Sequence, residues 1–282
     1  MGQIKTPYSI AIIMTSHNRK DVTMHCLRDL FKCRIPEGVS IKTYLMDDGC
    51  TDGTPEAVAS EFPQVKLLKG NGNLYWNRGT YECWKVAMAD KHDAYMWLND
   101  DVFLFENVFE EILEVYVTIP DKSIVTGHLH ASKDSNEPCY GGLINWEPFA
   151  PTGKPVKVLA SCGNVFFVPQ CVVDVMGNVC HLYKHKFGDY DYSIRAVKKG
   201  VDVYTTRCYV GICDHRRNIE VWESPDYPLG VRLKRFFSTT GVAPIEYAIY
   251  CFRTRPFKTA LLSSILIPLG HFKHCLFPRT KK

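Results

Sequence analysis

The sequence predicts an α/β fold in which helices flank a mixed, mostly parallel sheet and a helical tail follows. Apolar runs of strand length alternate with amphipathic segments of helix length through most of the chain. Such alternation is typical of β-α-β units, whose right-handed crossovers leave the strands parallel in one sheet. Polar and acidic residues directly follow several of these apolar runs, and the last part of the chain is strongly basic.

The N-terminal part reads as a β-α-β-α-β series. Residues 8–14 are a continuous apolar run that suits the centre of a parallel sheet, and the polar residues 15–18 can cap the next helix. A Gly/Asn-rich loop at 70–79 suits an oxygen-rich anion but contains neither a P-loop nor a dinucleotide fingerprint. The predicted strands are 8–14, 41–46, 65–68 and 94–98, and the predicted helices are 19–32, 55–62 and 80–90.

The C-terminal part of the body continues the alternation less regularly. Residues 133–155, rich in Gly, Pro, Asn and Trp, are expected to form an exposed loop or hairpin over the sheet. Gly163-Asn164 interrupts a strand at 158–168, and a glycine there permits close approach of a neighbour or ligand. The other predicted elements are helices at 106–117, 169–176 and from the 187–195 segment to Gly200, and strands at 123–128, 201–204 and 209–213.

Charge divides the chain into an acidic body and a basic tail. Residues 231–282 hold ten Lys or Arg and one acid, a net charge of +9, whereas the remaining 24 bases and 29 acids give the body −5. Basic and apolar residues alternate in the tail. This pattern suits either amphipathic helices on an anionic membrane surface or helices packed on the body with their bases in water.

Composition also bears on the cellular compartment. No stretch reaches the length of a membrane-spanning helix, and residues 1–7 lack the apolar region of a secretory signal. The twelve cysteines form no Cys-x-x-Cys pair and lie mostly in apolar runs, as buried thiols do in a reducing compartment. We therefore expect a cytoplasmic protein, peripheral at the inner face of the membrane if the tail binds lipid.

Asn99-Asp100-Asp101 follows an apolar run, at the carboxyl end of a predicted strand where open α/β sheets bind their ligands. Adjacent carboxylates repel each other, which disfavours ionisation of both without a cation. A hard divalent ion shared with a substrate phosphate would relieve this repulsion. For an isolated triplet, a solvated loop or an acidic helix cap would be the better explanation, so the neighbouring motifs decide its interpretation.

Six short motifs follow one another along the chain. They are Ile12-Ile13-Met14-Thr15-Ser16-His17-Asn18-Arg19, Met46-Asp47-Asp48-Gly49-Cys50-Thr51-Asp52-Gly53-Thr54, Leu98-Asn99-Asp100-Asp101, Ser161-Cys162-Gly163-Asn164, Phe187-Gly188-Asp189-Tyr190-Asp191 and Asp214-His215. In this order they resemble the motifs of the inverting glycosyltransferases of family 2, although Asn99 stands where the family has the first acid of Asp-x-Asp and Gly188 stands where Glu is usual. The resemblance implies a GT-A fold (a Rossmann-like nucleotide-diphospho-sugar transferase) over residues 1–228, followed by the basic amphipathic helical tail at 229–282.

The resemblance implies a nucleotide-sugar donor at the carboxyl ends of the first strands. Asp48 would accept a hydrogen bond from the ring imide of uracil or thymine, and Thr15 and His17 would line the same base pocket. Asp100 would face the ribose or the waters of a metal. The stretch Gly-Asn-Leu-Tyr-Trp-Asn-Arg-Gly resembles a loop of the rhamnosyltransferase-like branch, although Arg is common there in place of Trp76. On this basis the residues also assigned to the donor site are Trp76, Asn77 and Arg78.

The same resemblance assigns the metal and the catalytic groups. Asp101 would bind Mn²⁺ or Mg²⁺ directly and His215 would complete the coordination, so that the metal acts as a Lewis acid on the departing diphosphate. Asp189 is the candidate general base for the acceptor hydroxyl. Asp191 is the second candidate, although an acid in the first turn of a helix is its simpler role. A single base and a metal-bound leaving group imply one displacement with inversion. The acceptor side is assigned to Gly163 and Asn164.

We expect transfer of a sugar to a polysaccharide or lipid-linked glycan acceptor, with no nucleic-acid partner. The donor we favour is dTDP-rhamnose, with UDP-linked sugars as the alternative. A second class of function is a catalytically silent GT-A-like module that binds a sugar nucleotide or acts as a scaffold, and Asn99, Trp76 and Gly188 keep this reading open. A sugar nucleotidyltransferase would need a Gly-rich loop with Arg or Lys after Met14, and the chain lacks one.

Overall fold

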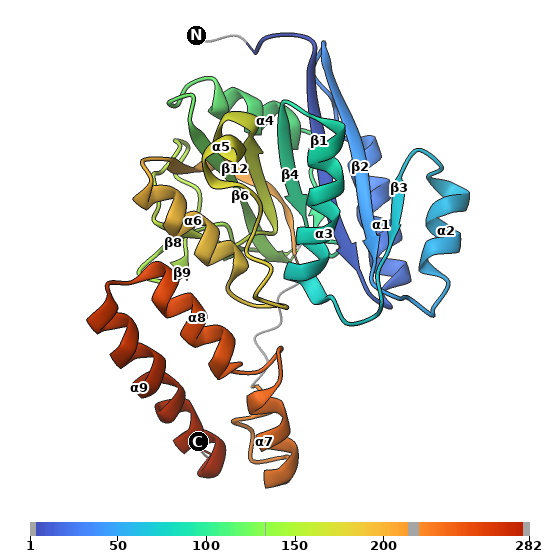
Figure 1. The fold of residues 1–282 in the computed structure, drawn as a ribbon. Helices are drawn as coiled ribbons and strands as arrows, with labels where there is room; N and C mark the ends of the chain where they lie inside the picture. The colour runs from blue at the N-terminus through green and yellow to red at the C-terminus, as the bar shows by residue number, and fades with distance from the viewer. Residues whose placement is uncertain (1–3, 133, 214–219, 279–282) are drawn as a thin grey trace.

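The computed structural model describes residues 4–132, 134–213 and 220–278. A central sheet carries helices on both faces, and the helices of the tail form a further layer beside one edge (Figure 1). The sheet is mixed and mostly parallel, as the sequence predicts.

The central sheet has the strand order β3-β2-β1-β4-β11-β6-β12-β5, with β7 paired to β6, over the described residues. Pairing is parallel from β3 to β4, whereas β11 lies antiparallel between β4 and β6. A second, small antiparallel sheet has the order β10-β8-β9. The strands are β1 Tyr8–Ser16, β2 Val39–Asp47, β3 Lys66–Lys69, β4 Ala94–Leu98, β5 Phe103–Leu104, β6 Ser123–Ser132, β7 Ser135–Tyr140, β8 Gly142–Ile144, β9 Glu147–Pro148, β10 Ala160–Ser161, β11 Val165–Pro169 and β12 Asp202–Ile212.

Two hydrophobic cores lie on opposite faces of this sheet, because side chains alternate across a strand. In β1, Ile10, Ile12 and Met14 pack into the core under α1, α2 and α4, while Ala11 and Ile13 pack under α3, α5 and α6. The helices are α1 Lys20–Lys32, α2 Thr54–Glu61, α3 Tyr75–Asp90, α4 Val108–Tyr116, α5 Gln170–Met176, α6 Gly188–Lys198, α7 Leu229–Phe237, α8 Pro244–Thr254 and α9 Phe257–Leu276.

Four predicted elements differ in the structure. The strand expected at 158–168 is two strands in different sheets, because the chain leaves the small sheet after Ser161 and enters the central sheet at Val165. The strands expected at 201–204 and 209–213 are one strand, β12, with register shifts after Thr205. Helix α3 begins at Tyr75 instead of residue 80, because the Asp48 carboxylate accepts the backbone N–H groups of its N-cap Leu74 and its first residue Tyr75.

The carboxyl ends of β1, β2 and β4 meet at one edge of the sheet. Ser16 pairs with Asp47, and the Asp48 N–H donates to the Ser16 carbonyl at 2.9 Å. The break between β10 and β11 reaches the same edge, because the Asn99 N–H donates to the Asn164 carbonyl at 3.0 Å. The polar residues that follow these strands therefore lie together.

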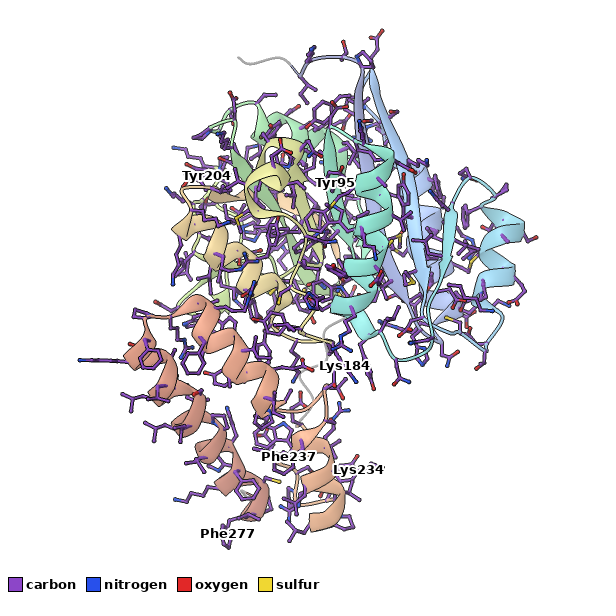
Figure 2. All side chains as sticks on the ribbon, viewed as in Figure 1. Tyr95, Lys184, Tyr204, Lys234, Phe237 and Phe277 are labelled. Carbon is purple, nitrogen blue, oxygen red and sulfur yellow. The ribbon has the colours of Figure 1, made fainter. Side chains whose placement is uncertain are left out.

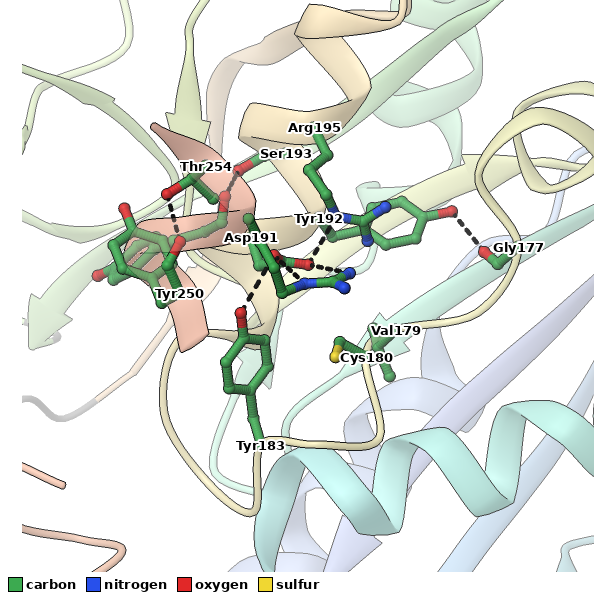
Figure 3. A network of polar contacts seen from close by, with 12 residues as sticks. Gly177, Val179, Cys180, Tyr183, Asp191, Tyr192, Ser193, Arg195, Tyr250 and Thr254 are labelled. Carbon is green, nitrogen blue, oxygen red and sulfur yellow. Dashed lines mark hydrogen bonds and ion pairs between the residues drawn. The ribbon is translucent and has the colours of Figure 1, made fainter. Parts of the chain in front are cut away.

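Helix α8 of the tail is fastened to the body through α6 (Figure 3). Asp191, which is fully buried, accepts hydrogen bonds from Arg195 Nε at 2.8 Å, from Arg253 Nε of α8 at 2.8 Å and from the Tyr183 hydroxyl at 3.1 Å. Lys198 Nζ also donates to the Thr254 carbonyl at 2.6 Å. Packing on the body, one of the two arrangements considered for the tail, is therefore correct for α8.

We expect Asp191→Asn to lower the free energy of unfolding by about 3 kcal/mol, because it leaves two arginines facing a neutral amide in a buried site. Urea unfolding monitored by circular dichroism measures this change. The control is Glu61→Gln, which removes an exposed ion pair with Arg28 and should leave stability near that of the wild type. Equal stability of the Asp191 variant and the control would contradict a fastening role for this network.

Candidate functional site

A cavity of about 700 Å³ opens at the carboxyl edge of the central sheet. The ends of β1, β2 and β4 form its wall together with the first turn of α3, the β10–β11 break and the start of α6. It brings together most of the site residues expected from the sequence, namely Thr15, His17, Asp48, Trp76, Asp100, Asp101, Gly163, Asn164 and Asp189.

Asp48 organises one wall of this cavity. Its carboxylate is buried and accepts the backbone N–H groups of Gly72, Leu74 and Tyr75, each at 2.9 Å. Oδ2 accepts two of these bonds and Oδ1 accepts one, so one lone pair of Oδ1 remains for another donor. The Asp48 carbonyl also lies 2.6 Å from His17 Nδ1, which holds the imidazole at the cavity wall.

The Thr15 hydroxyl is a further polar group at this wall. Its oxygen is buried and has no hydrogen-bond partner among the described residues. Buried hydroxyls are normally satisfied, so an unpartnered one beside a cavity fits contact with a ligand.

Arg19 joins the two carboxylates that follow β4. Its guanidinium donates from Nη1 to Asp100 Oδ1 at 3.1 Å and from Nη2 to Asp101 Oδ2 at 2.8 Å. Asp100 also accepts the Thr23 hydroxyl at 3.0 Å. Burial raises the pKa of Asp100 to about 6, and the Arg19 charge opposes this shift. The positive charge of Arg19 therefore relieves part of the repulsion between the Asp100 and Asp101 carboxylates.

Asp101 retains one carboxylate oxygen for a ligand. Asp101 Oδ1 is buried at the cavity and has no hydrogen-bond partner among the described residues. An unpartnered carboxylate oxygen suits a hard divalent cation. The described ranges contain no group of three His, Cys, Asp or Glu side chains placed to hold an ion, and His215 lies outside them. These residues fit a metal held by Asp101 with the remaining ligands from substrate and water.

Trp76 forms the floor of the cavity. Its Nε1 donates to the Asn99 side-chain oxygen at 2.7 Å, and its ring packs edge-on against Trp97 of β4 with 6.2 Å between centroids. Asn99, which stands where an acid was expected, is therefore a neutral acceptor for the Trp76 indole N–H. Gly163 lies against the same ring, where an added Cβ would stand 2.9 Å from a Trp76 ring carbon.

Asp189 also lines the cavity, at the start of α6. Its Oδ2 accepts the Gly163 N–H at 3.0 Å and its Oδ1 accepts the Tyr190 N–H at 2.9 Å, which fixes the carboxylate. Burial raises the pKa of Asp189 to about 6, against the lowering effect of these two N–H groups. A carboxylate held in this way is ionised near neutral pH, is more basic than an exposed one and keeps one lone pair on each oxygen.

Three predicted site residues lie away from the cavity. Asn77 is fully buried and its amide donates to the carbonyls of Cys180 at 2.7 Å and Tyr183 at 2.8 Å. Arg78 donates to the His181 carbonyl at 3.1 Å, over a separate hollow. Asp191 is enclosed by its arginines, as described above. The geometry gives these three residues structural roles instead of the predicted binding and catalytic ones.

The structure also explains why Gly188 replaces the usual Glu. A Cβ at this position would collide with Asn77 Oδ1. Because Asn77 is held by the two carbonyls, it cannot move aside without loss of those bonds. The departure from the family pattern is therefore a packing consequence of Asn77.

Several residues at the cavity were not assigned from the sequence. His185 and Lys186 reach it from the segment before α6, and Tyr75, Tyr140 and Tyr190 complete its walls. Burial lowers the pKa of His185 to about 4, so its imidazole is neutral. Arg19 could have been assigned to the site from the sequence, because it is the last residue of the first motif and directly follows the polar residues at the end of β1.

Comparison with known proteins agrees with this geometry. Residues 11–161, more than half of the chain, match the sequence profile described as Glycosyl transferase family 2. The match includes Asp48 and the Asn99-Asp100-Asp101 triplet. A search of curated proteins finds no match.

Solved structures share the fold at low sequence identity. The mannosyltransferase PcManGT from Pyrobaculum calidifontis, in complex with GDP-Man and Mn²⁺, has 12% identity and a TM-score of 0.59 over 98% of this chain and 75% of its own. S. aureus TarS 1-349, in complex with UDP-GlcNAc, has 11% identity and a TM-score of 0.59, with coverage of 97% and 74%. GalNAc-T7 with UDP, GalNAc and Mn²⁺ has 11% identity and a TM-score of 0.58, and the chain covers 58% of that protein.

Proposed function

Because the chain belongs to glycosyl transferase family 2, we propose that it moves one sugar from a nucleotide-sugar donor to a glycan hydroxyl with inversion at the anomeric carbon. The observation that carries this proposal is the composition of the cavity. The unpartnered Asp101 oxygen and the fixed Asp189 carboxylate both belong to its wall. These are the two groups that a single displacement needs, one near the leaving diphosphate and one near the attacking hydroxyl.

The donor base lies between Thr15, His17 and the loop that Asp48 holds. The unpartnered Thr15 hydroxyl and the remaining Asp48 Oδ1 lone pair can pair with the imide edge of uracil or thymine. The diphosphate lies near Arg19 and Lys186, which are the Lys and Arg side chains of the described cavity wall. Asp100, buried between Arg19 and Thr23, faces the ribose side and positions Arg19.

Asp101 would hold a divalent ion, Mn²⁺ or Mg²⁺, through Oδ1. When bound, such an ion supplies Lewis-acid stabilisation of the charge on the departing diphosphate. Two of the structurally similar proteins are described with Mn²⁺, which supports this assignment. Arg19 keeps Asp101 oriented through Oδ2 and so leaves Oδ1 toward the cavity.

Asp189 removes the proton from the acceptor hydroxyl as its oxygen attacks the anomeric carbon. The bond between that carbon and the diphosphate oxygen breaks, and the nucleoside diphosphate leaves. The Gly163 and Tyr190 N–H groups hold the carboxylate in place, and Asn164 lies beside them on the acceptor side. The donor sugar we favour remains rhamnose from dTDP-rhamnose, on the resemblance of the residues around Trp76.

The contacts of Trp76, Asn99 and Gly188 weaken the alternative of a catalytically silent module. The indole of Trp76 bonds the Asn99 amide, and Gly188 makes room for Asn77, so each departure from the family pattern has a packing explanation. None of the three removes Asp101 or Asp189 from the cavity. We therefore favour the enzyme.

The tail supplies a membrane-binding surface in this proposal. None of the described helices is long and apolar enough to cross a bilayer. On α9, Leu261, Leu262, Ile265, Leu266 and Leu269 are each 43–61% exposed and share one helical face, with exposed lysines 258 and 273 at its two ends. Figure 2 shows Phe277 at the end of this layer farthest from the sheet. An apolar stripe bordered by lysines fits an anionic lipid surface and through it a lipid-linked acceptor.

Asp189→Asn should lower kcat by a factor of about 10² to 10⁴ without loss of nucleotide binding, because the amide cannot accept the proton. In the wild type, kcat/KM should rise with pH through about 6, since Asp189 must be ionised and its pKa is raised to about 6. Steady-state kinetics over pH 5 to 8, with nucleotide titration by calorimetry, measures both effects. Activity of the variant at the wild-type level would place the base elsewhere.

A thermal-shift screen of dTDP-, UDP- and GDP-linked sugars, with and without Mn²⁺ or Mg²⁺, tests the donor and the metal together. A ligand that binds only the folded state raises the melting temperature by mass action. We expect stabilisation by one class of nucleotide sugar, strengthened by metal, and loss of the metal effect in Asp101→Ala. Thr118→Ala, at the end of α4, is the control. A donor response that EDTA leaves unchanged would overturn the metal assignment.

Leu262→Glu with Leu266→Glu should reduce binding to vesicles of phosphatidylcholine and phosphatidylglycerol at least tenfold. The two acids interrupt the apolar stripe and repel the anionic surface. Cosedimentation measures binding, with Ala59→Glu and Ser60→Glu on exposed positions of α2 as the charge-matched control. Equal sedimentation of both double variants would show that the stripe does not contact lipid.

A further inference from the structure

A second cavity of about 530 Å³ adjoins the first on its acceptor side. Tyr140 and Tyr190 line both cavities, so the two hollows share a wall. The second lies between β7, the β8–β9 hairpin and the start of α6, and Leu143, Trp146 and Cys162 also line it. A molecule that fills it would lie against Tyr190, the residue that follows Asp189.

The β8–β9 hairpin holds Trp146 at this cavity in an unfavourable backbone conformation. Ile144 pairs with Glu147, so the turn consists of Asn145 and Trp146, with φ of +52° and +67°. Tight hairpin turns of this kind favour Asn followed by Gly, because a bulky side chain is disfavoured at positive φ. The Trp146 side chain is 55% exposed and so gains little burial in return. A costly conformation that contributes little to the core points to a role in binding.

The Trp146 indole is connected to Asp189, the proposed general base, through Tyr190. Its ring meets that of Tyr190 edge to face, with 6.2 Å between centroids and 86° between planes. The Tyr190 hydroxyl lies 3.7 Å from Cys162 Sγ, and the Tyr190 N–H donates to Asp189 Oδ1. Trp146 therefore contacts Tyr190, and Tyr190 contacts Asp189, so these three residues connect the second cavity with the first.

We propose that the second cavity binds a pyranose unit of the acceptor glycan, with the C–H face of the sugar against the indole of Trp146. This assignment rests on the proposed transferase function and specifies its acceptor. An aromatic surface with nearby polar groups is how proteins bind ligands that have one apolar face. Glu137 places an exposed carboxylate at the described wall, which favours an uncharged sugar over a phosphorylated or acidic one.

Saturation-transfer NMR on the full chain with excess UDP or dTDP tests this assignment. The probes are the methyl pyranosides of glucose, galactose, mannose, rhamnose and N-acetylglucosamine, and the methyl glycoside of N-acetylneuraminic acid. We expect transfer to the ring C–H protons of at least one neutral pyranoside, with affinity reduced at least tenfold in Trp146→Ala. Trp146→Phe should stay within about threefold of the wild type. The acidic glycoside should bind more weakly than the neutral ones.

Ile144→Ala is the matched control, because Ile144 is 48% exposed on the same hairpin but does not line the cavity. It should bind the pyranosides as the wild type does, and thermal unfolding of all variants checks that the hairpin remains folded. Neutral pyranoside binding that Trp146→Ala leaves unchanged, or none at all in the wild type, overturns the acceptor assignment. The nucleotide-sugar thermal shift is read in the same variants. If that shift persists in Trp146→Ala while pyranoside binding is unaffected, the acceptor assignment fails and the transferase proposal stands.

Discussion

The Asp48 carboxylate is the constraint on which the rest of the cavity depends. By accepting three backbone N–H groups it ends the Gly/Asn-rich loop and starts α3 at Tyr75. That start places Trp76 on the cavity floor and Asn77 inside the protein, where its amide holds the carbonyls of the 180–183 segment. The same segment leads into α6, and Gly188 fits against Asn77 so that Asp189 follows at the cavity. One carboxylate at the end of β2 thus positions groups that lie more than a hundred residues later in the chain.

The acidic pair after β4 is stabilised by a positive charge that the chain itself supplies. Arg19 contacts both Asp100 and Asp101, and its side chain is 44% exposed, so the pair is only partly shielded from solvent. The two acids are consequently unequal. Asp100 is enclosed by Arg19 and Thr23, whereas Asp101 keeps an oxygen toward the cavity. This arrangement allows the fold to form before any metal or donor is present, since the repulsion between neighbouring carboxylates is already reduced.

Most of the fold could be predicted from local sequence patterns. The apolar runs of the strands, the polar residues at their carboxyl ends and the basic tail are all recognisable in the sequence. The grouping of Asp48, Asp101 and Asp189 was predicted from the resemblance to family 2, and all three line the cavity. The structural roles of Asn77 and Arg78 were not, because the earlier start of α3 depends on tertiary hydrogen bonds to Asp48. His185 and Lys186 escaped assignment because the segment before α6 has no regular period, and tertiary contacts with α3 and with the tail bring it to the cavity. Trp146 lies in a stretch expected to be a loop or hairpin, whose shape depends on pairing between β8 and β9.

The fastening of α8 to α6 through Asp191 has a consequence for orientation. Because α9 packs on α8, a bilayer bound along the outer stripe of α9 would meet the catalytic body at a constant tilt and height. The tail lies beside the carboxyl edge of the sheet, where the cavity also opens (Figure 1). The three helices would then act as a spacer of fixed dimensions. Acceptors anchored in lipid would be selected by how far their reactive hydroxyl stands above the membrane, in addition to the identity of their sugars.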